Sequence, residues 1–300
     1  MKHRTIPAIG MNLHSRDSLR AEGFVAMAYE ESMNAEPARL QPHYHDFFQV
    51  SLLRGPGRLM HDFREKNVDG LTLLFITPGQ VHTVKPEADM RGTIISFTRE
   101  FFDASSETGA TLLLELPFYF ATDTPPWLSL DPVRETEIPA LFRELQSEAD
   151  LARPDAPEVI RALLRILFIK SRRLHTAKTA APQTVRATAL VRSFQLAVEK
   201  HFLEWASLAP YARKLSVSVN HLNDVVSAAT GRAAGEHIRL RRLLAAKRQL
   251  LHSELTVSEI GFKLGFKDPS YFSRFFRRYE KLTPAAFRAR SREKYQQQTG

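Results

Sequence analysis

The last 120 residues of this 300-residue chain contain one arrangement twice: a short helical pattern, a tight turn and a second helical pattern. The two units span residues 207–231 and 256–280. Ser218 is expected to cap the second helix of the first unit. Asp268 is expected to cap the second helix of the second unit, with Pro269 at its first position. Gly265 ends the helix before that turn. The pattern restricts this part of the chain to an all-helical domain with two helix-turn-helix units.

A long helix is predicted between the two units, over about 236–252. Its inner face consists of Ile238, Leu243, Ala246 and Leu250. Its outer face carries five cations, Arg239, Arg241, Arg242, Lys247 and Arg248.

The net charge of +9 is confined to this helical part. Residues 181–300 contain 21 Lys and Arg but only 9 Asp and Glu, whereas residues 1–180 contain 21 and 24. Segregated positive charge of this kind is typical of a surface that binds phosphate. A well-solvated basic helical surface would give the same balance.

Residues 40–100 have a strand pattern instead. The runs 47–53, 71–76 and 93–97 are separated by turn residues, which predicts a small antiparallel sandwich or barrel. A helical period follows over 135–174, with one apolar stripe through Ile160, Leu164 and Leu167 and a second through Ile166 and Ile169. The second stripe indicates either a dimer contact, with Ile166 and Ile169 as candidates, or a helix buried in its own monomer.

The segment 176–188 is small and polar without apolar periodicity, so we expect a linker there, between a domain of residues 1–175 and one of 189–295. The chain has no cysteine, which excludes disulfides and cysteine-ligated metals. It also has no apolar run of membrane-spanning length and no N-terminal apolar stretch of signal-peptide length. We expect a soluble, cytoplasmic protein.

The second unit contains the motif residues Gly265-Phe266, Asp268, Ser270-Tyr271-Phe272-Ser273-Arg274, Phe276, Thr283-Pro284 and Phe287-Arg288. Through these residues it closely resembles the AraC family of transcriptional regulators. The first unit and the joining helix match more loosely, through Ser218, His221-Leu222, Thr230-Gly231, Ile238, Arg242 and Ala246. The chain departs from the family pattern at Lys281, where Gly is usual, and at Gly261, where Ala is usual.

The N-terminal half contains His43-Tyr44-His45, the Gly55-x-Gly57 turn, Pro78 to His82 and Gly92 to Phe97. Through these residues it resembles the cupin-like sensor domain common in that family. The resemblance implies a two-domain α+β protein: a cupin-like barrel with helices that dimerise, then an all-α domain with two helix-turn-helix units joined by a long helix. It also implies a small-molecule effector, double-stranded DNA as a partner and RNA polymerase as a further one.

Candidate DNA-contacting residues follow from the inner faces of the two recognition helices. Outward positions for base contact are Asn220, Asn223, Asp224, Ser270, Tyr271 and Arg274. Asn suits adenine, Asp can accept from cytosine, and Arg suits guanine. The candidates for phosphate contact are Ser218, Arg242, Arg277 and Arg278. A solvated polar surface is the alternative for each position.

The effector-pocket candidates are His43, His45, Gln49, His82 and Phe97. Metal-binding cupin enzymes place a Glu where this chain has Gln49, and a neutral amide is a poorer ligand for a divalent cation. We therefore expect no metal, no cofactor and no catalytic residues, with the histidines lining a pocket or packed in the barrel wall.

These features predict a sequence-specific DNA-binding regulator, an effector-responsive activator or repressor, whose barrel controls the C-terminal domain. The alternatives are a cupin-type metal-dependent enzyme with a DNA-binding tail and an architectural basic protein that binds DNA without specificity.

Overall fold

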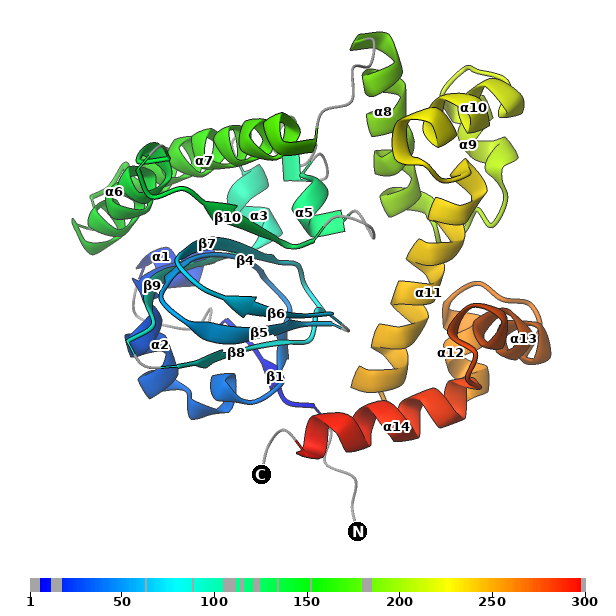
Figure 1. The fold of residues 1–300 in the computed structure, drawn as a ribbon, viewed down its shortest axis with the longest axis horizontal. Helices are drawn as coiled ribbons and strands as arrows, with labels where there is room; N and C mark the ends of the chain where they lie inside the picture. Colours follow the sequence, from blue (N-terminus) through cyan, green and yellow to red (C-terminus); the bar gives the residue numbers. More distant parts are fainter. Residues whose placement is uncertain are drawn as a thin grey trace. The chain divides into compact units, whose positions relative to one another are not determined.

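The computed structural model describes residues 6–11, 18–62, 64–87, 89–104, 112–113, 116–120, 125–133, 135–151, 153–179 and 185–297. The chain divides into two compact units. One comprises residues 7–120 and 124–180 and contains the strands, and the other is the helical part from residue 181 onward (Figure 1). No helix in the described ranges combines the length and the apolar character needed to cross a membrane.

Antiparallel sheets form the centre of the N-terminal unit. The larger sheet has the order β10 (Trp127–Leu130), β7 (Leu71–Ile76), β4 (Phe48–Arg54), β9 (Arg91–Phe97) and β2 (Phe24–Ala28). The smaller has the order β6 (Arg64–Val68), β5 (Gly57–His61) and β8 (His82–Pro86), and β1 (Ala8–Ile9) pairs in parallel with β3 (Tyr44–His45). The three predicted strands are therefore confirmed as β4, β7 and β9, each within two residues at its ends.

Side-chain alternation gives the larger sheet two different faces. Along β4, Phe48, Val50 and Leu52 join one hydrophobic cluster, whereas Leu53 joins another with Leu59 of β5. Since successive residues of a strand point to opposite faces, the sheet packs on helices with one face and toward the smaller sheet with the other. The interior between the sheets is the side that can hold a ligand.

Short helices precede and follow the strands of this unit. They are α1 (Ser18–Glu22), α2 (Tyr29–Ala35), the 3-10 turn Pro37–Leu40, α3 (Arg99–Asp103) and α5 (Pro117–Phe120). The predicted helical stretch is two helices, α6 (Glu137–Leu151) and α7 (Ala156–Thr179), which lie over the larger sheet (Figure 1). Ile160, Leu164 and Leu167 of α7 are completely buried against it, which confirms the first apolar stripe.

The C-terminal unit is all α-helical in the described residues, and both helix-turn-helix units form. Its helices are α8 (Val185–His201), α9 (Leu208–Lys214), α10 (Val219–Thr230), α11 (Ala234–His252), α12 (Val257–Lys263), α13 (Pro269–Glu280) and α14 (Pro284–Gln297). Figure 1 shows α11 as the long helix that joins α9–α10 to α12–α13. It starts two residues before the predicted joining helix and ends at the same residue.

Helix extends into both ends of the predicted linker, 176–188. Helix α7 continues to Thr179 and α8 begins at Val185, while residues 180–184 lie outside the described residues. Ala and Lys favour helix even where no apolar stripe is present, so lack of periodicity alone did not mark the helix end.

Candidate functional site

Helices α10 and α13 are equivalent in length, cap and burial. Each has 12 residues, and the side chain of the residue before it accepts a backbone hydrogen bond from the first turn. Ser218 Oγ accepts from His221 N at 3.1 Å and Asp268 Oδ1 from Ser270 N at 2.8 Å, which confirms both predicted caps. Leu222 on α10 and Phe272 on α13 are completely buried at corresponding positions. The two helices therefore expose corresponding positions.

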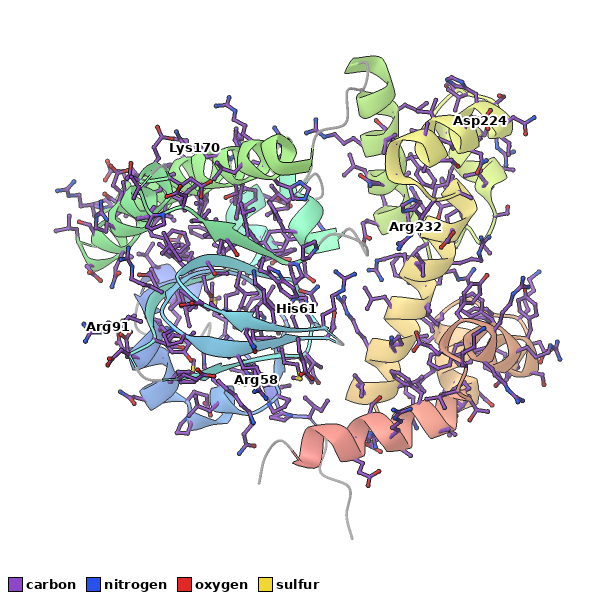
Figure 2. All side chains as sticks on the ribbon, viewed as in Figure 1. Arg58, His61, Arg91, Lys170, Asp224 and Arg232 are labelled. Carbon is purple, nitrogen blue, oxygen red and sulfur yellow. The ribbon has the colours of Figure 1, made fainter. Side chains whose placement is uncertain are left out.

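The exposed side chains include most of the predicted base-contact candidates. Asn220 and Asp224 are exposed on α10, and Ser270, Tyr271 and Arg274 on α13; Figure 2 labels Asp224 on its helix. Tyr271 is 58% exposed although it is large and aromatic.

His221 is a further exposed residue of α10 that was not among the predicted base-contact candidates. It stands three residues after its cap, as Tyr271 does on α13. Aligning the two helices on Ser218 and Asp268 would have found it.

Asn223 does not lie with the exposed residues, which corrects one prediction. It is half-buried, and its side-chain oxygen accepts a hydrogen bond from Ala234 N at 3.1 Å. A bidentate pair with adenine needs that oxygen, so the amide is committed to joining α10 to the start of α11.

Arg242 is also not available as a phosphate contact. It is 5% exposed, its Nη2 donates to Leu264 O at 2.7 Å, and its guanidinium lies over the Phe266 ring. Burial lowers its pKa. The prediction was wrong because helical spacing does not show that α12 and its turn cover this side of α11.

Other cations of the joining helix are likewise used within the domain. Arg241 Nε donates to both carboxylate oxygens of Glu199 at 2.8 and 2.9 Å, and Lys247 Nζ donates to Glu280 at 3.0 Å. By contrast, Arg277 and Arg278 are exposed near the end of α13, and Ser218 is exposed at the start of α10. Arg277 and Arg278 of α13 are therefore more exposed than Arg241, Arg242 and Lys247 of α11.

Lys281 ends α13 in the left-handed conformation, with φ 61°, and its N–H bonds to Arg277 O. Gly231 does the same after α10, with φ 71°. We expect Lys281→Gly to stabilise the protein by about 1 kcal/mol, because a residue with a Cβ loses roughly that much free energy in the left-handed conformation and glycine does not. Urea unfolding followed by Trp205 fluorescence in a Trp127→Phe background would measure it. A loss of stability would instead assign a stabilising role to the hydrogen bond from Lys281 Nζ to Arg278 O.

A narrow pocket lies between the sheets of the N-terminal unit, with about 320 Å³ of empty space including the solvent at its mouth. Its polar lining is Arg39, His43, Gln49, Ser51 and His82, and its other lining residues are Tyr29, Met33, Leu53, Val84 and Ile94. Three of the five predicted pocket residues, His43, Gln49 and His82, are thus brought together in the pocket wall.

The histidines at this pocket are neutral. Burial lowers the pKa of His43 to about 4, and burial followed by the charges of His43 and His45 takes the pKa of His82 well below its usual range. The Nδ1 atoms face the backbone oxygens of Gln41 at 2.8 Å and Gln80 at 3.2 Å. A neutral ring facing a carbonyl with Nδ1 carries its hydrogen there, so each Nε2 is an acceptor.

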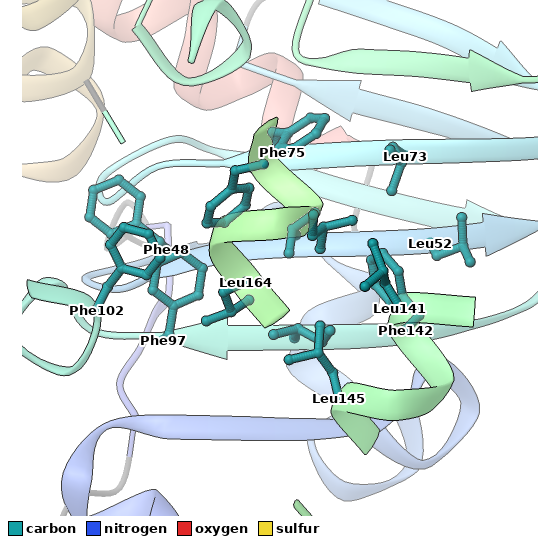
Figure 3. Packing of buried hydrophobic residues seen from close by; sticks show 14 of the residues in the cluster. Phe48, Leu52, Leu73, Phe75, Phe97, Phe102, Leu141, Phe142, Leu145 and Leu164 are labelled. Carbon is teal, nitrogen blue, oxygen red and sulfur yellow. The ribbon is translucent and has the colours of Figure 1, made fainter. Parts of the chain in front are cut away.

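His45 and Phe97 do not line the pocket, contrary to prediction. His45 is 2% exposed, stacks on Phe47 with 4.0 Å between ring centroids and has a pKa lowered by burial to about 3. Phe97 pairs in register with Phe48 and points, as Phe48 does, to the helix-covered face, where it meets Phe102 (Figure 3). Alternation along β9 puts Phe97 on the same face as Ile95 and opposite Ile94, which does line the pocket.

Gln49 Nε2 donates to Ser51 Oγ at 3.0 Å. Within the described residues, no three side chains of the His, Cys, Asp and Glu types are grouped so that they could hold a metal ion.

The second apolar stripe of α7 is uncovered within its own unit at its centre. Ile166 is 42% exposed and Ile169 is half-buried, and Val159 on the same side is 37% exposed.

Comparison with known proteins matches each unit to a described domain. The sequence model of the AraC-like ligand binding domain matches residues 24–168, and that of a helix-turn-helix domain matches residues 211–290. The HTH-type transcriptional activator RhaS of Escherichia coli (strain SE11) is 24% identical over 280 residues, which cover 92% of this chain and 96% of RhaS.

Comparison with solved structures gives matches to most of this chain and to its C-terminal part alone. ToxT from Vibrio cholerae O395 is 14% identical, with 89% of this chain and 97% of ToxT covered and a TM-score of 0.42. The DNA-binding domain of AdpA in complex with a target DNA is 28% identical, with 35% and 94% covered and a TM-score of 0.32. Because the two domain matches include the pocket strands in one unit and both recognition helices in the other, the chain belongs to the AraC family of transcriptional regulators, with an N-terminal ligand-binding domain and a C-terminal helix-turn-helix DNA-binding domain.

Proposed function

We propose that this protein is an effector-responsive activator that binds an asymmetric DNA site through α10 and α13 and acts as a homodimer with RNA polymerase as its partner. The observation that carries the proposal is the pair of equally capped, equally buried helices with different exposed side chains. Asn220, His221 and Asp224 stand on one, and Ser270, Tyr271 and Arg274 on the other. A DNA-binding function also supports the predicted cytoplasmic location.

The length of α11 shapes the DNA site. Its 19 residues span about 28 Å at 1.5 Å per residue, whereas successive major-groove faces on one side of B-DNA are about 34 Å apart. Either the recognition helices enter the grooves obliquely or the DNA bends toward the protein, at a cost of a few kcal/mol set by the sequence between the half-sites. We expect two unlike half-sites per monomer.

Arg274→Ala is expected to weaken binding by about 1–3 kcal/mol and to relax base preference in one half-site only, since an arginine near the start of a recognition helix suits guanine. Arg277→Ala is the matched control further along the same helix. It should weaken binding to all sequences alike and lower the salt slope by about one unit, as loss of a phosphate contact does. Affinities for a library of single-base variants of a selected site would measure both.

Asp224→Ala should change base preference in the other half-site. If Arg274→Ala and Asp224→Ala altered the same base pairs, or if neither altered preference, the two-groove arrangement would be wrong. Equal affinity for the selected site and for competitor DNA would support an architectural role instead.

The homodimer is expected to form through the exposed stripe of α7. Ile166→Glu combined with Ile169→Glu should yield folded monomers, because two carboxylates in an apolar contact lack partners. Analytical ultracentrifugation would report the mass, and circular dichroism the fold. Arg143→Glu, which changes the charge by the same amount at an exposed position of α6, should leave the dimer intact. Unfolding of the double variant would assign both stripes to the monomer core.

We infer a regulator rather than a metal-dependent enzyme. Gln49 presents an amide bonded to Ser51 where a cupin enzyme would need a carboxylate ligand. Purified protein that held a stoichiometric divalent metal would favour the enzyme.

A further inference from the structure

Arg39 gives the ligand pocket a cation that the sequence reasoning did not single out. It belongs to the 3-10 turn Pro37–Leu40 and lines the pocket beside His43. Its Nη1 donates to Ser32 Oγ at 2.8 Å, while its Nε is buried and has no hydrogen-bond partner. A buried guanidinium N–H without an acceptor is costly, so an acceptor on a bound ligand would stabilise Arg39.

The pocket wall holds no charge that would balance Arg39. Among the described residues that line the pocket, it is the only one with a formal charge, because His43 and His82 are neutral and no Asp or Glu takes part. Outside the lining, the charges of Glu36 and Arg20 act on Arg39 in opposite directions. The pocket lining therefore carries one positive charge and no negative charge, with Glu36 as the larger of the two outside charges that act on Arg39.

The remaining polar groups of the wall favour a ligand that also donates hydrogen bonds. The Nε2 atoms of His43 and His82 are acceptors, since each ring uses its Nδ1 hydrogen toward a backbone oxygen. Hydroxyl groups are suitable donors to such nitrogens. Met33, Leu53 and Ile94 supply apolar contact for a short carbon skeleton.

We propose that the effector of this protein is a small hydroxy acid whose carboxylate binds the Arg39 guanidinium and whose hydroxyl groups donate to His43 and His82. This inference rests on the proposed effector-sensing function. A carboxylate matches the planar guanidinium, and its single negative charge equals the single positive charge of the pocket. A phosphate ester, with a charge near −2 at pH 7, would leave about one negative charge buried without a partner.

The experiment compares acids with their own amides, which have nearly the same shape without the charge. The full chain is titrated at constant ionic strength with lactate and lactamide, 3-hydroxybutyrate and 3-hydroxybutyramide, and gluconate and gluconamide, by calorimetry and by thermal shift. We expect at least one acid to bind at least tenfold more tightly than its amide and to raise the melting temperature. Equal binding of acid and amide in every pair, or no binding of any acid, would overturn the inference.

Variants at Arg39 then locate the anion. Arg39→Gln should remove the preference for acid over amide, with at least a tenfold loss of affinity for the acid. Arg39→Lys should keep that preference with a weaker affinity, because an ammonium group supplies the charge without the paired N–H donors of a guanidinium. Arg39→Lys also tests the assignment if Arg39→Gln does not fold. Arg58→Gln, which removes an exposed cation from β5 (Figure 2), should bind as wild type. Unchanged acid affinity in either Arg39 variant would contradict the assignment.

A DNA measurement on the same wild-type preparation separates the two possible failures. If the full chain selects a specific site from a random DNA pool but neutral molecules bind as tightly as acids, only the hydroxy-acid inference fails. If the chain selects no site, the proposed function itself fails.

Discussion

We expect the affinity of the fragment 185–300 for DNA to fall by about three orders of magnitude between 50 and 200 mM salt. A protein that neutralises about six phosphates releases as many counterions, which gives a loss of about 10³ over this range. The exposed cations of the two helix-turn-helix units include Arg213, Lys214, Lys263, Lys267, Arg277 and Arg278. Fluorescence anisotropy of a labelled duplex at several salt concentrations would give the slope.

The salt slope also tests which cations touch DNA. Arg277→Ala combined with Arg278→Ala should lower the slope by about two units. Arg241→Ala should leave it unchanged, because that guanidinium is paired with Glu199 inside the domain. A fragment whose affinity did not depend on salt would contradict the electrostatic basis of the proposed interface.

Gly265→Ala should destabilise the C-terminal unit by about 2–3 kcal/mol. Gly265 has φ 77°, where a side chain costs about 1–2 kcal/mol, and an added Cβ would collide with the backbone oxygen of Leu203. This close approach joins the turn of the second helix-turn-helix unit to the chain that follows α8. Urea unfolding read from Trp205 in a Trp127→Phe background would measure the loss.

Gly231→Ala is the matched control, since Gly231 has φ 71° but nothing within 4 Å of an added Cβ. Gly231→Ala should lower the free energy of unfolding by about 1 kcal/mol, because it adds a Cβ at a positive φ without a collision. Equal losses for the two variants would mean that the approach to Leu203 contributes nothing. If Gly265→Ala lowered the free energy of unfolding but changed the free energy of DNA binding less, Gly265 would be needed for folding and not for DNA contact.

Local signals in the sequence predicted the DNA-binding helices well. Ser218 and Asp268 act as caps within three residues of the backbone groups they satisfy, and Pro269 starts its helix. Such interactions depend on the neighbouring chain and not on the rest of the fold. Strand β2 was not predicted, because a single short run, Phe24–Ala28, becomes recognisable only through its pairing with β9.

Two of the errors involve contacts with distant parts of the chain. Arg242 was assigned to phosphate from helical spacing, yet Leu264 and Phe266 enclose it. Phe97 was assigned to the pocket from its place in a motif, yet strand parity directs it to the helices. Arg39 was not predicted as a pocket residue, because a single arginine in a loop belongs to no sequence pattern.

The sequence by itself determined the two-domain plan, the helix-turn-helix layout and the location of the basic charge, because periodicity, caps and charge balance are properties of neighbouring residues. Only the tertiary structure decided which charged side chains are available. Of the cations in and around the joining helix, Arg241, Arg242 and Lys247 bind protein groups, whereas Arg277 and Arg278 remain exposed. The same holds for the pocket, where the 3-10 turn Pro37–Leu40 packs against β8 and places Arg39 beside neutral histidines. Burial and partner geometry arise from contacts between distant segments, and these contacts decide whether a charge serves the fold or a ligand.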